Sequence, residues 1–302
     1  MYIMIVNPTA GNGRGKKVYE SVKKLPLYAE LTTMEYVTEY EGHATEIVQQ
    51  VERYDSIEAI IVIGGDGTMN EVVNGLTKNI PLSFIPAGSG NDFYRGIGQP
   101  KHPVQILQNI VQTNNVKSYS YARVRDEQHE KSFINCIGFG FDAFVVKRAN
   151  QSYLKNVFNK LGLGTLLYVY ALIAELFSYR PFHVNIHIDG KLHAFKRCFL
   201  LTVNNQPYFG GGMKINPFAE NNAEHFSIVV VDSISKWKVL FLFVTVFFGL
   251  HTRFKEVFIL NGKQLKISIQ SATLYQIDGE PFETKSCSIE KQPYPLRIKG
   301  CS

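Results

Sequence analysis

Cysteine is scarce in this sequence, and the four cysteines are far apart. They are Cys136, Cys198, Cys287 and Cys301, and none belongs to a Cys-x-x-Cys pair. This spacing argues against a disulfide framework and against a zinc site. We therefore expect reduced thiols and a cytoplasmic protein.

The sequence also lacks a signal peptide and a long uninterrupted apolar run. Its start, Met1–Pro8, has no basic region and no extended apolar region. The apolar stretch Leu161–Phe177 is interrupted by two glycines and a glutamate. The stretch Trp237–Leu250 has 14 residues, and a helix of that length reaches ~21 Å, less than the ~30 Å hydrocarbon core. A membrane-spanning helix is therefore not expected.

Two interpretations of Trp237–Leu250 remain open. The stretch is either a helix buried in a protein core or an element that lies in a membrane interface. The second interpretation rests on the lysines that flank Trp237 and on two further cations, Arg253 and Lys255, beyond the stretch.

The composition excludes disorder, collagen and coiled coil. Apolar residues make up 45% of the 302 residues and charged residues 19%, and no short period repeats. This length predicts two domains or one large one. The net charge of +6 is uneven, since residues 1–120 carry 10 basic and 12 acidic side chains and residues 121–302 carry 22 and 14. The basic second part indicates either an anionic partner, such as an acidic membrane, or a solubilising excess.

The first hundred residues alternate between apolar runs and helical patterns. Such alternation predicts a parallel sheet covered by helices, with ligands bound beyond the carboxyl ends of the strands. The expected strands are Tyr2–Val6, Leu31–Val37, Ala59–Ile63 and Pro81–Ile85, and the expected helices are Lys16–Lys24, Gly42–Glu52 and Thr68–Leu76.

After about residue 120, short alternating runs separated by turn residues predict an antiparallel β domain with helices near 141–178 and 235–250. The expected strands are Tyr119–Val124, Ser132–Ile137, His183–Ile188, Cys198–Val203, Phe226–Val231, Gln264–Ile269, Thr273–Ile277 and Ser286–Glu290. The expected turns are Asp189-Gly190, Asn261-Gly262 and Asp278-Gly279.

Three loops follow strands of the first domain, and the first of them is residues 7–15. This loop fails the dinucleotide pattern G-x-G-x-x-G because position 16 is Lys, and it also fails the P-loop pattern. It remains a Gly-rich turn before a helix, which favours a phosphate through backbone N–H groups.

The second loop, residues 64–71, places three glycines around Asp66. Glycines permit a close backbone approach to a ligand, and Asp66 could reach a metal–phosphate or accept a proton. Thr68 is predicted to cap the following helix, with Glu71 completing a capping box. The alternative is a plain strand-to-helix turn.

The third loop, residues 86–93, is again small and polar. Ser89 could donate to a phosphate, and Asn91 and Asp92 could bind a ribose or order the neighbouring loop. Three such loops at one edge of a sheet predict a crevice for nucleotide phosphates.

Asp278-Gly279-Glu280 is the main candidate in the second part. It is either a hairpin turn or the source of a general base for an alcohol nucleophile. Gly210–Gly212 is either a mobile loop or a close approach to a ligand. The eight histidines show no metal-ligand spacing, and nothing in the pattern predicts a nucleic-acid partner.

The chain resembles the diacylglycerol kinase catalytic family over nearly its whole length, and within it the soluble bacterial lipid kinases. The resemblance rests on Asn7-Pro8-x-Ala10-Gly11, Gly64-Gly65-Asp66-Gly67-Thr68-x-Asn70-Glu71, Pro86-x-Gly88-Ser89-x-Asn91-Asp92-Phe93, Thr38-Glu39, Gly138–Asp142 and Asp278-Gly279-Glu280. The Gly-Gly-Asp-Gly loop is also similar to that of NAD kinases and phosphofructokinases.

The resemblance implies a nucleotide domain of residues 1–120 with a return segment, 292–302, and a β-sandwich-like lipid domain of residues 121–291. It implies transfer of the ATP γ-phosphoryl group to a lipid hydroxyl with Mg²⁺, in phospholipid metabolism, at the cytoplasmic membrane face. The protein would contact an anionic membrane peripherally, and an exposed strand edge would permit a homodimer.

The resemblance also implies roles for individual residues. Asp66 would work with Mg²⁺ and the phosphates, and Glu280 or Asp278 would take the proton of the lipid hydroxyl. The residues implied at the nucleotide are Asn7, Gly11, Thr38, Gly64, Gly65, Asp66, Gly67, Thr68, Asn70, Glu71, Gly88, Ser89, Asn91 and Asp92.

The sequence departs from the family pattern at Ala223-Glu224, where some members carry an Asp-Gly pair of a magnesium-binding surface. Glu220 or Glu224 could substitute for that pair, so the departure weakens the case for a structural metal there and leaves the question open. The alternatives to an active lipid kinase are a nucleotide-binding regulatory protein with little catalysis and a soluble-substrate kinase similar to NAD kinase.

Overall fold

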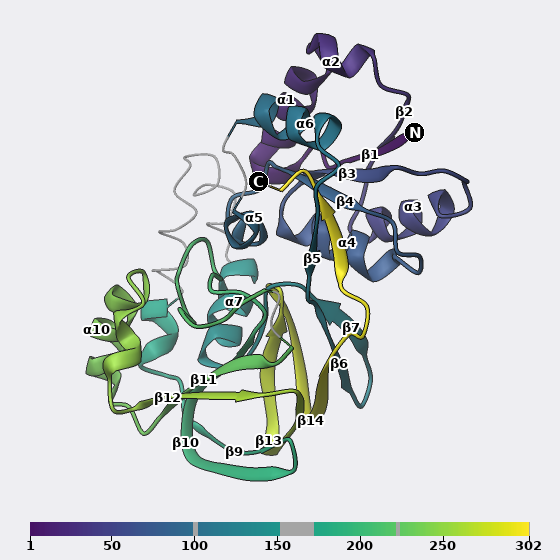
Figure 1. Cartoon of the computed structure of the whole chain (residues 1–302). Coiled ribbons are helices and arrows are strands. Elements are labelled where there is room, and N and C mark those ends of the chain that lie inside the picture. Colours follow the sequence, from purple (N-terminus) through teal and green to yellow (C-terminus); the bar gives the residue numbers. More distant parts are fainter. Residues whose placement is uncertain (99–101, 152–171, 222–223, 302) are drawn as a thin grey trace. The chain divides into compact units, whose positions relative to one another are not determined.

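The computed structural model describes residues 1–98, 102–151, 172–221 and 224–301. The chain forms two compact units (Figure 1). Unit 1 comprises Met1–Tyr119 and Tyr294–Ser302, and unit 2 comprises Ser120–Pro293. The limits expected from the sequence were residues 120 and 292.

Unit 1 is built on a six-stranded sheet whose first five strands are parallel. The strand order is β2-β1-β3-β4-β15-β5, and only β5 runs antiparallel to its neighbour. The strands β1 and β3 are buried along their whole length, as their continuous apolar runs predict. The strands are β1 (Tyr2–Val6), β2 (Thr33–Val37), β3 (Ala59–Gly64), β4 (Leu82–Pro86), β5 (Val116–Tyr119) and β15 (Leu296–Lys299).

The helices of unit 1 follow the predicted alternation with strands. They are α1 (Ala10–Lys23), α2 (Pro26–Ala29), α3 (His43–Val51), α4 (Asp66–Gly75), α5 (Asp92–Ile97) and α6 (Pro103–Gln112). Ile106, Leu107 and Ile110 of α6 are fully buried and share one core with β1 and β3. The predicted α/β domain with a parallel sheet is confirmed.

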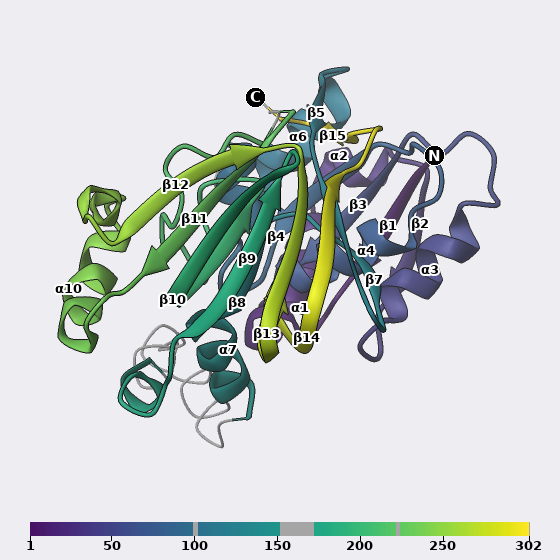
Figure 2. The ribbon, with the colours of Figure 1, turned by 90° about the horizontal axis from the view of Figure 1, so that it is seen from below.

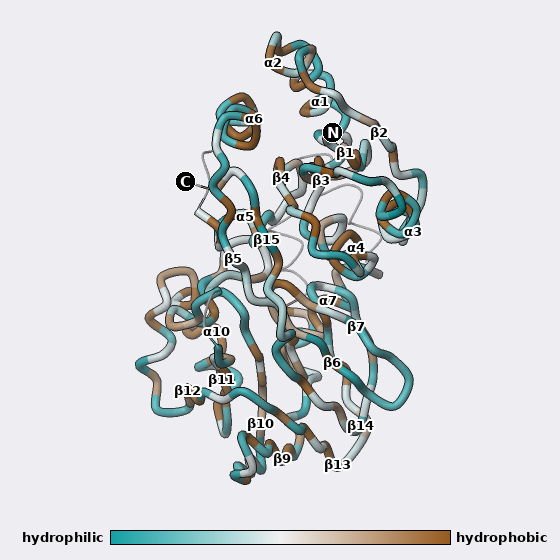
Figure 3. The backbone as a smooth tube through the Cα atoms, turned by 45° about the vertical axis from the view of Figure 1, so that its right-hand side comes forward, coloured by the Kyte–Doolittle hydropathy of each residue, from teal (hydrophilic) through white to brown (hydrophobic). Residues whose placement is uncertain are grey.

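Unit 2 is an antiparallel sheet of nine strands in the order β12-β11-β10-β8-β13-β14-β6-β7, with β9 paired to β10 and β13 (Figure 2). Its strands are β6 (Ala122–Asp126), β7 (Glu130–Phe133), β8 (Cys136–Gly140), β9 (Phe182–Ile188), β10 (Lys191–Asn204), β11 (Phe226–Asp232), β12 (Val257–Gly262), β13 (Gln264–Ile277) and β14 (Glu280–Lys291). Hydrophilic and hydrophobic residues alternate along several of these strands (Figure 3). The predicted antiparallel domain is confirmed.

Two apolar cores stabilise unit 2. One lies within the strands and includes Phe133, Phe139 and Tyr275. The other joins strands to α7 (Phe141–Gln151) and α10 (Lys236–Val246), which a short 3₁₀ turn, η1 (Leu250–Arg253), follows. All four cysteines are buried and none forms a disulfide, which agrees with the expectation of no disulfide framework.

The structure corrects several predicted strands. Tyr119–Val124 is not one strand, because Tyr119 ends β5 in unit 1 and Ala122 begins β6 in unit 2. Gln264–Ile269 and Thr273–Ile277 form the single strand β13, whose register with β14 shifts between them. Asn261-Gly262 is not a hairpin turn, since β12 pairs with β11 and β13 pairs elsewhere.

The structure describes one of the two long apolar stretches in full and the other only in part. Most of Leu161–Phe177 lies outside the described residues, as does Ala223. Trp237–Leu250 forms α10 and the turns after it. Among the described residues, no helix has the length and hydropathy needed to cross a membrane.

The strand β15 ties the carboxyl end of the chain into the middle of the unit 1 sheet. It lies between β4 and β5, and Leu296 and Ile298 are buried there. Lys299 Nζ lies 2.5 Å from Glu58 Oε1, and the Ser83 hydroxyl donates to the Lys299 carbonyl at 3.0 Å.

We predict that Ile298→Ala lowers the free energy of unfolding by about 2–5 kcal/mol, because it leaves a cavity in the core where the buried side chain packs against the face of the sheet. Urea denaturation monitored by circular dichroism measures this. The control is Arg297→Ala on the exposed side of the same strand, which should change stability by less than about 0.5 kcal/mol. Equal losses in both variants would contradict the prediction.

Candidate functional site

The carboxyl ends of four parallel strands meet at one edge of the unit 1 sheet. Asn7, Thr38, Gly65 and Ala87 directly follow β1, β2, β3 and β4. Backbone hydrogen bonds join these ends, since Asn7 N–H donates to Ile63 O at 2.9 Å and Thr38 N–H to Val6 O at 2.8 Å. The three Gly-rich loops therefore lie at one edge, as the parallel topology predicts.

Asn7 organises the first loop. Its side-chain oxygen accepts hydrogen bonds from Thr9 and Ala10 backbone N–H groups, both at 3.1 Å. Its side-chain nitrogen donates to Thr68 Oγ1 at 3.0 Å, which ties the first loop to the second. Asn7 thus holds two loops in register, a role that its place after β1 did not reveal.

Gly11 brings the first loop against the third. Its φ is +56°, and a Cβ atom there would lie 2.1 Å from the Ala87 carbonyl oxygen. Asn12 and Gly13 also have positive φ, so the first turn of α1 is left-handed. The sequence predicts that the helix starts at Lys16, whereas α1 starts at Ala10. Only glycine fits position 11 without moving the backbone of the third loop.

The capping box predicted for Thr68 and Glu71 is wrong. Helix α4 begins at Asp66, with Gly65 as its N-cap, so Thr68 already lies within the first turn. Thr68 is buried and bonded to Asn7, while Glu71 Oε2 accepts from Ala44 N–H at the start of α3 at 3.2 Å. The helix therefore starts at Asp66, before Thr68, the residue that was predicted to cap it.

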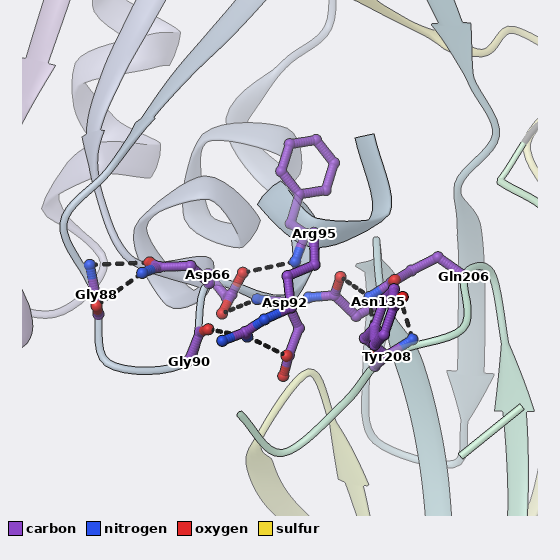
Figure 4. A network of polar contacts seen from close by, with 10 residues as sticks. Asp66, Gly88, Gly90, Asp92, Arg95, Asn135, Gln206 and Tyr208 are labelled. Carbon is purple, nitrogen blue, oxygen red and sulfur yellow. Dashed lines mark hydrogen bonds and ion pairs between the residues drawn. The ribbon is translucent and has the colours of Figure 1, made fainter. Parts of the chain in front are cut away.

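Asp66 joins the second loop to the third. Its carboxylate accepts hydrogen bonds from the backbone N–H groups of Asp92 and Phe93 at 3.0 and 2.9 Å (Figure 4). These groups open α5, so Asp66 provides the side-chain acceptor that the Asn91 N-cap does not. The Asp92 carboxylate in turn lies 2.9 Å from Arg95 Nη1.

Two glycines bring the second and third loops into backbone contact. A Cβ atom at Gly88 would lie 2.6 Å from Gly65 Cα, and one at Gly65 would lie 3.2 Å from Gly88 Cα. The Asn91 side chain closes the third loop by accepting from Gly88 N–H at 2.9 Å and donating to Gly88 O at 2.8 Å. Ser89, at the tip of this loop, is exposed.

Gly67 differs from its neighbouring glycines. A Cβ atom there would meet no described atom within 4 Å, and its φ lies outside the left-handed region. Neither packing nor backbone strain therefore explains a glycine in the first turn of α4. Its presence leaves the N-terminus of a ten-residue helix open to a close ligand.

The remaining residues predicted at the nucleotide lie within the packed part of unit 1. Thr38 and Asn70 are buried, and Asn70 Oδ1 accepts from Asn74 Nδ2 at 3.0 Å inside α4. Gly64 lies against Thr68, with its Cβ position 2.7 Å from Thr68 Oγ1. These residues pack beneath the loops in the interior of unit 1.

In unit 2, Asp278-Gly279-Glu280 forms the predicted tight hairpin turn between β13 and β14. Asp278 and Gly279 have φ of +45° and +94°, as a two-residue turn of the primed type requires. The Asp278 carboxylate accepts from three successive backbone N–H groups, Ile134, Asn135 and Cys136, at 2.7, 3.0 and 2.9 Å. It therefore fixes the segment between β7 and β8.

Glu280 has a different environment from Asp278. Its side chain is 38% exposed and forms an ion pair with Lys131, whose Nζ also lies 5.6 Å from the centre of the Phe282 ring. A cavity of about 380 Å³ lies beside this turn and is lined by Lys147, Asn150, Leu274, Pro281, Phe282 and Glu283. Glu280 is thus a partly exposed carboxylate held by an ion pair, whereas the Asp278 carboxylate is held by three backbone N–H groups.

The sequence did not predict the buried side chains that hold this turn in place, Gln276 and Asp142. Gln276 Oε1 accepts from Gly279 N–H at 2.7 Å, and Gln276 Nε2 donates to Asp142 Oδ2 at 3.2 Å. Asp142 is fully enclosed, and desolvation raises the pKa of its carboxyl to about 7. A Cβ atom at Gly138 would lie 1.7 Å from Asp142 Oδ2, which explains the glycine in the Gly138–Asp142 segment.

A second buried network supports the segment that Asp278 holds. Gln206 Nε2 donates to Asn135 Oδ1 at 2.9 Å, and Gln206 Oε1 accepts from Tyr208 N–H at 3.1 Å (Figure 4). Asn135 and Gln206 were not predicted. The only signal in the sequence was a run of polar residues, Asn204–Gln206, directly after an apolar strand.

The structure also describes the glycine run and Glu224 of unit 2. Gly210, Gly211 and Gly212 all have positive φ, in a loop closed by a bridge between Phe209 and Met213. Glu224 lies 2.5 Å from Lys263 Nζ and is exposed. The described residues contain no group of three or more His, Cys, Asp or Glu side chains placed to hold a metal ion.

Two family models match the chain. The diacylglycerol kinase catalytic domain matches residues 1–124. The YegS C-terminal NAD kinase beta sandwich-like domain matches residues 135–300. Together the two models cover both units.

Several curated proteins are similar over most of their length. YtlR of Bacillus subtilis, which carries a provisional lipid kinase name, is 33% identical over 99% of both chains. A diacylglycerol kinase of Mycobacterium tuberculosis is 30% identical over 80% of this chain and 76% of its own. A diacylglycerol kinase of Bacillus subtilis is 28% identical over 92% and 88%.

Solved structures agree on the fold. A Bacillus anthracis protein with a provisional diacylglycerol kinase description matches at a TM-score of 0.78 and 25% identity, over 99% of this chain and 94% of that one. An NAD kinase from Archaeoglobus fulgidus, solved in complex with ATP, matches at a TM-score of 0.54 and 14% identity, over 99% and 93%. The second likeness bears on the fold alone.

We predict that Asp142 makes the stability of the protein depend on pH. Its folded pKa of about 7 exceeds the ordinary 3.8, so the folded state binds more protons between these values. The stability it provides is present below about pH 4 and is lost as pH rises to about 7. At about 1.4 kcal/mol per pKa unit, the loss between about pH 5.5 and pH 8 is about 2 kcal/mol.

Asp142→Asn should remove this dependence, because the amide does not ionise and still accepts from Gln276. The measurement is the unfolding free energy of both proteins in urea at the two pH values. An unchanged pH dependence in the variant would show that Asp142 is ionised already at low pH.

Proposed function

The chain belongs to the diacylglycerol kinase catalytic family of lipid kinases, and we propose that it transfers the γ-phosphoryl group of ATP to the hydroxyl of a diacylglycerol-like lipid. The transfer would take place at the cytoplasmic face of a membrane. In such a reaction the protein mainly positions the reactants and neutralises charge, and it needs few reactive side chains.

The open glycine at position 67 is the observation that carries the nucleotide part of the proposal. Free N–H groups at a helix N-terminus attract phosphate, and the missing side chain lets the phosphate approach the backbone. Gly67 lies between Asp66 and Thr68, which connect the second loop to the third and the first. The phosphates would therefore lie where all three loops meet.

The residues of this edge also fit Mg²⁺ delivered with ATP. Magnesium keeps several waters and binds through one or two carboxylates and the substrate phosphates, rather than in an all-protein cage. Asp66 supplies a carboxylate at this edge, and the described residues hold no group of three or more His, Cys, Asp or Glu side chains that could form such a cage. When bound, the ion would neutralise charge that develops on the phosphoryl oxygens.

We propose Glu280 as the base that takes the proton of the lipid hydroxyl. Asp278 is less suited, since its oxygens hold three backbone N–H groups and moving it would release the segment after β7. The Glu280 side chain is partly exposed, and it pairs with the Lys131 ammonium rather than with the backbone. Asp142 and Gln276 hold the turn that carries Glu280 and act as positioning residues.

We predict that Glu280→Gln lowers kcat by about 10²–10⁴-fold, the range for loss of a general base, with little effect on the KM for ATP. The assay is ADP release from Mg-ATP with mixed micelles that contain diacylglycerol. Glu290→Gln, on the exposed side of the same strand, is the matched control and should retain full activity.

The same assay run without acceptor and with NAD tests the reaction class. Stimulation by lipid alone supports the proposal. Stimulation by NAD alone would replace it with an NAD-kinase-like activity, and ATP binding without turnover in any of the three would favour a regulatory protein.

We predict that Gly67→Ala raises the KM or Kd for ATP at least tenfold while the fold stays intact. The new methyl group would meet no atom of the described residues within 4 Å, and alanine in a helix is more stable than glycine by about 0.5–1 kcal/mol. The thermal unfolding temperature without ATP should therefore be unchanged or slightly higher. Unaltered ATP affinity in a folded variant would place the nucleotide elsewhere.

A further inference from the structure

Helix α10 of unit 2 presents a row of large apolar side chains to solvent. Trp237, Phe241 and Val244 on the helix and Phe248 in the turn after it are 68%, 69%, 61% and 73% exposed. Their spacing of four, three and four residues places them on one side of the helix. We call these four side chains the α10 face.

The other side of the helix is packed. Val239, Leu242 and Val246 are buried in the second apolar core of unit 2. The α10 face is therefore not part of an unfolded or loosely held segment, because the helix that carries it is anchored from behind. Phe177, itself 52% exposed, packs edge-on against Trp237 with ring centres 5.7 Å apart and extends the apolar surface.

The charged side chains of the segment that carries the α10 face are all cationic. From Lys236 to Lys255 there are four lysines and arginines, namely Lys236, Lys238, Arg253 and Lys255, and no aspartate or glutamate. The next acidic residue, Glu256, is buried and lies 2.6 Å from Lys238 Nζ. Arg253 and Lys255 are exposed.

We propose that the α10 face docks onto an anionic lipid bilayer, with the helix lying in the plane of the interface. An exposed aromatic and aliphatic row, in a segment that has cations and no acidic residue of its own, matches the boundary between acyl chains and anionic headgroups. The proposal rests on the proposed function, since a kinase of membrane lipids needs a way to reach them.

A second copy of the chain fits the α10 face less well. A symmetric interface through this face would bring the same cations of two copies together with no acidic partners in the segment. An anionic lipid surface instead supplies the opposite charge. The cations therefore favour lipid over self-association.

The chain contains an intrinsic probe, because Trp237 is its only tryptophan. The full-length protein is titrated with vesicles of neutral phosphatidylcholine and with vesicles containing 30% phosphatidylglycerol. We expect a blue shift of the tryptophan emission with the anionic vesicles, and quenching by lipids brominated in the upper acyl chain. Absence of both effects would overturn the proposal.

Two pairs of variants separate the apolar and the charged contributions. Phe241→Gln with Phe248→Gln should weaken binding to anionic vesicles at least tenfold. Arg253→Gln with Lys255→Gln should weaken it about 30-fold at low salt and leave neutral vesicles unaffected. The control, Leu192→Gln with Tyr294→Gln, removes two large side chains that are 54% and 77% exposed outside the α10 face, and it should bind normally.

The remaining outcomes distinguish this proposal from the proposed function. Concentration-dependent dimerisation without lipid, abolished by the phenylalanine pair, would assign the face to a second copy and overturn the docking proposal. Normal phosphorylation of a short-chain, water-soluble diacylglycerol by a wild-type protein that does not bind vesicles would overturn docking alone. Vesicle binding by a protein without kinase activity would sustain docking and refute the proposed function.

Discussion

The Asp66 carboxylate is the contact on which the unit 1 site depends. It reaches from the second loop to the two N–H groups that open α5, and so fixes the third loop against the second. The glycine contacts at positions 11, 65 and 88 are possible only while this spacing holds. Asn7 closes the set through Thr68. Contacts within the protein thus hold the three loops in one arrangement, and such a held arrangement lowers the entropic cost of binding a ligand.

Much of the fold could be predicted because its physical causes are local. The runs Tyr2–Val6 and Ala59–Ile63 are apolar on both faces, and only a strand covered on both sides explains that. The errors arose where a non-local effect decided the structure. Nothing in the alternation of Tyr119–Val124 shows that the chain leaves one sheet after Tyr119 and enters another at Ala122.

The candidate site was predictable in its loops and not in its supports. Gly-rich segments that follow strands are recognisable in the sequence. The role of each single residue, however, depends on tertiary contacts that the sequence does not show. Gly138 is required by an aspartate on the following helix, and Gln276 acts through both ends of its amide. Thr68 was predicted to cap a helix because threonine is common at that position. In the structure its hydroxyl oxygen instead accepts a hydrogen bond from the Asn7 side chain.

The position of β15 has a consequence for how the protein is made. The sheet of unit 1 begins with residues 2–6 and receives its fifth strand only from residues 296–299. A chain emerging from the ribosome therefore cannot complete its first unit until after all of unit 2 has been synthesised. Unit 2 is continuous in sequence and is free to fold first, which reverses the usual amino-terminal order of domain folding during translation.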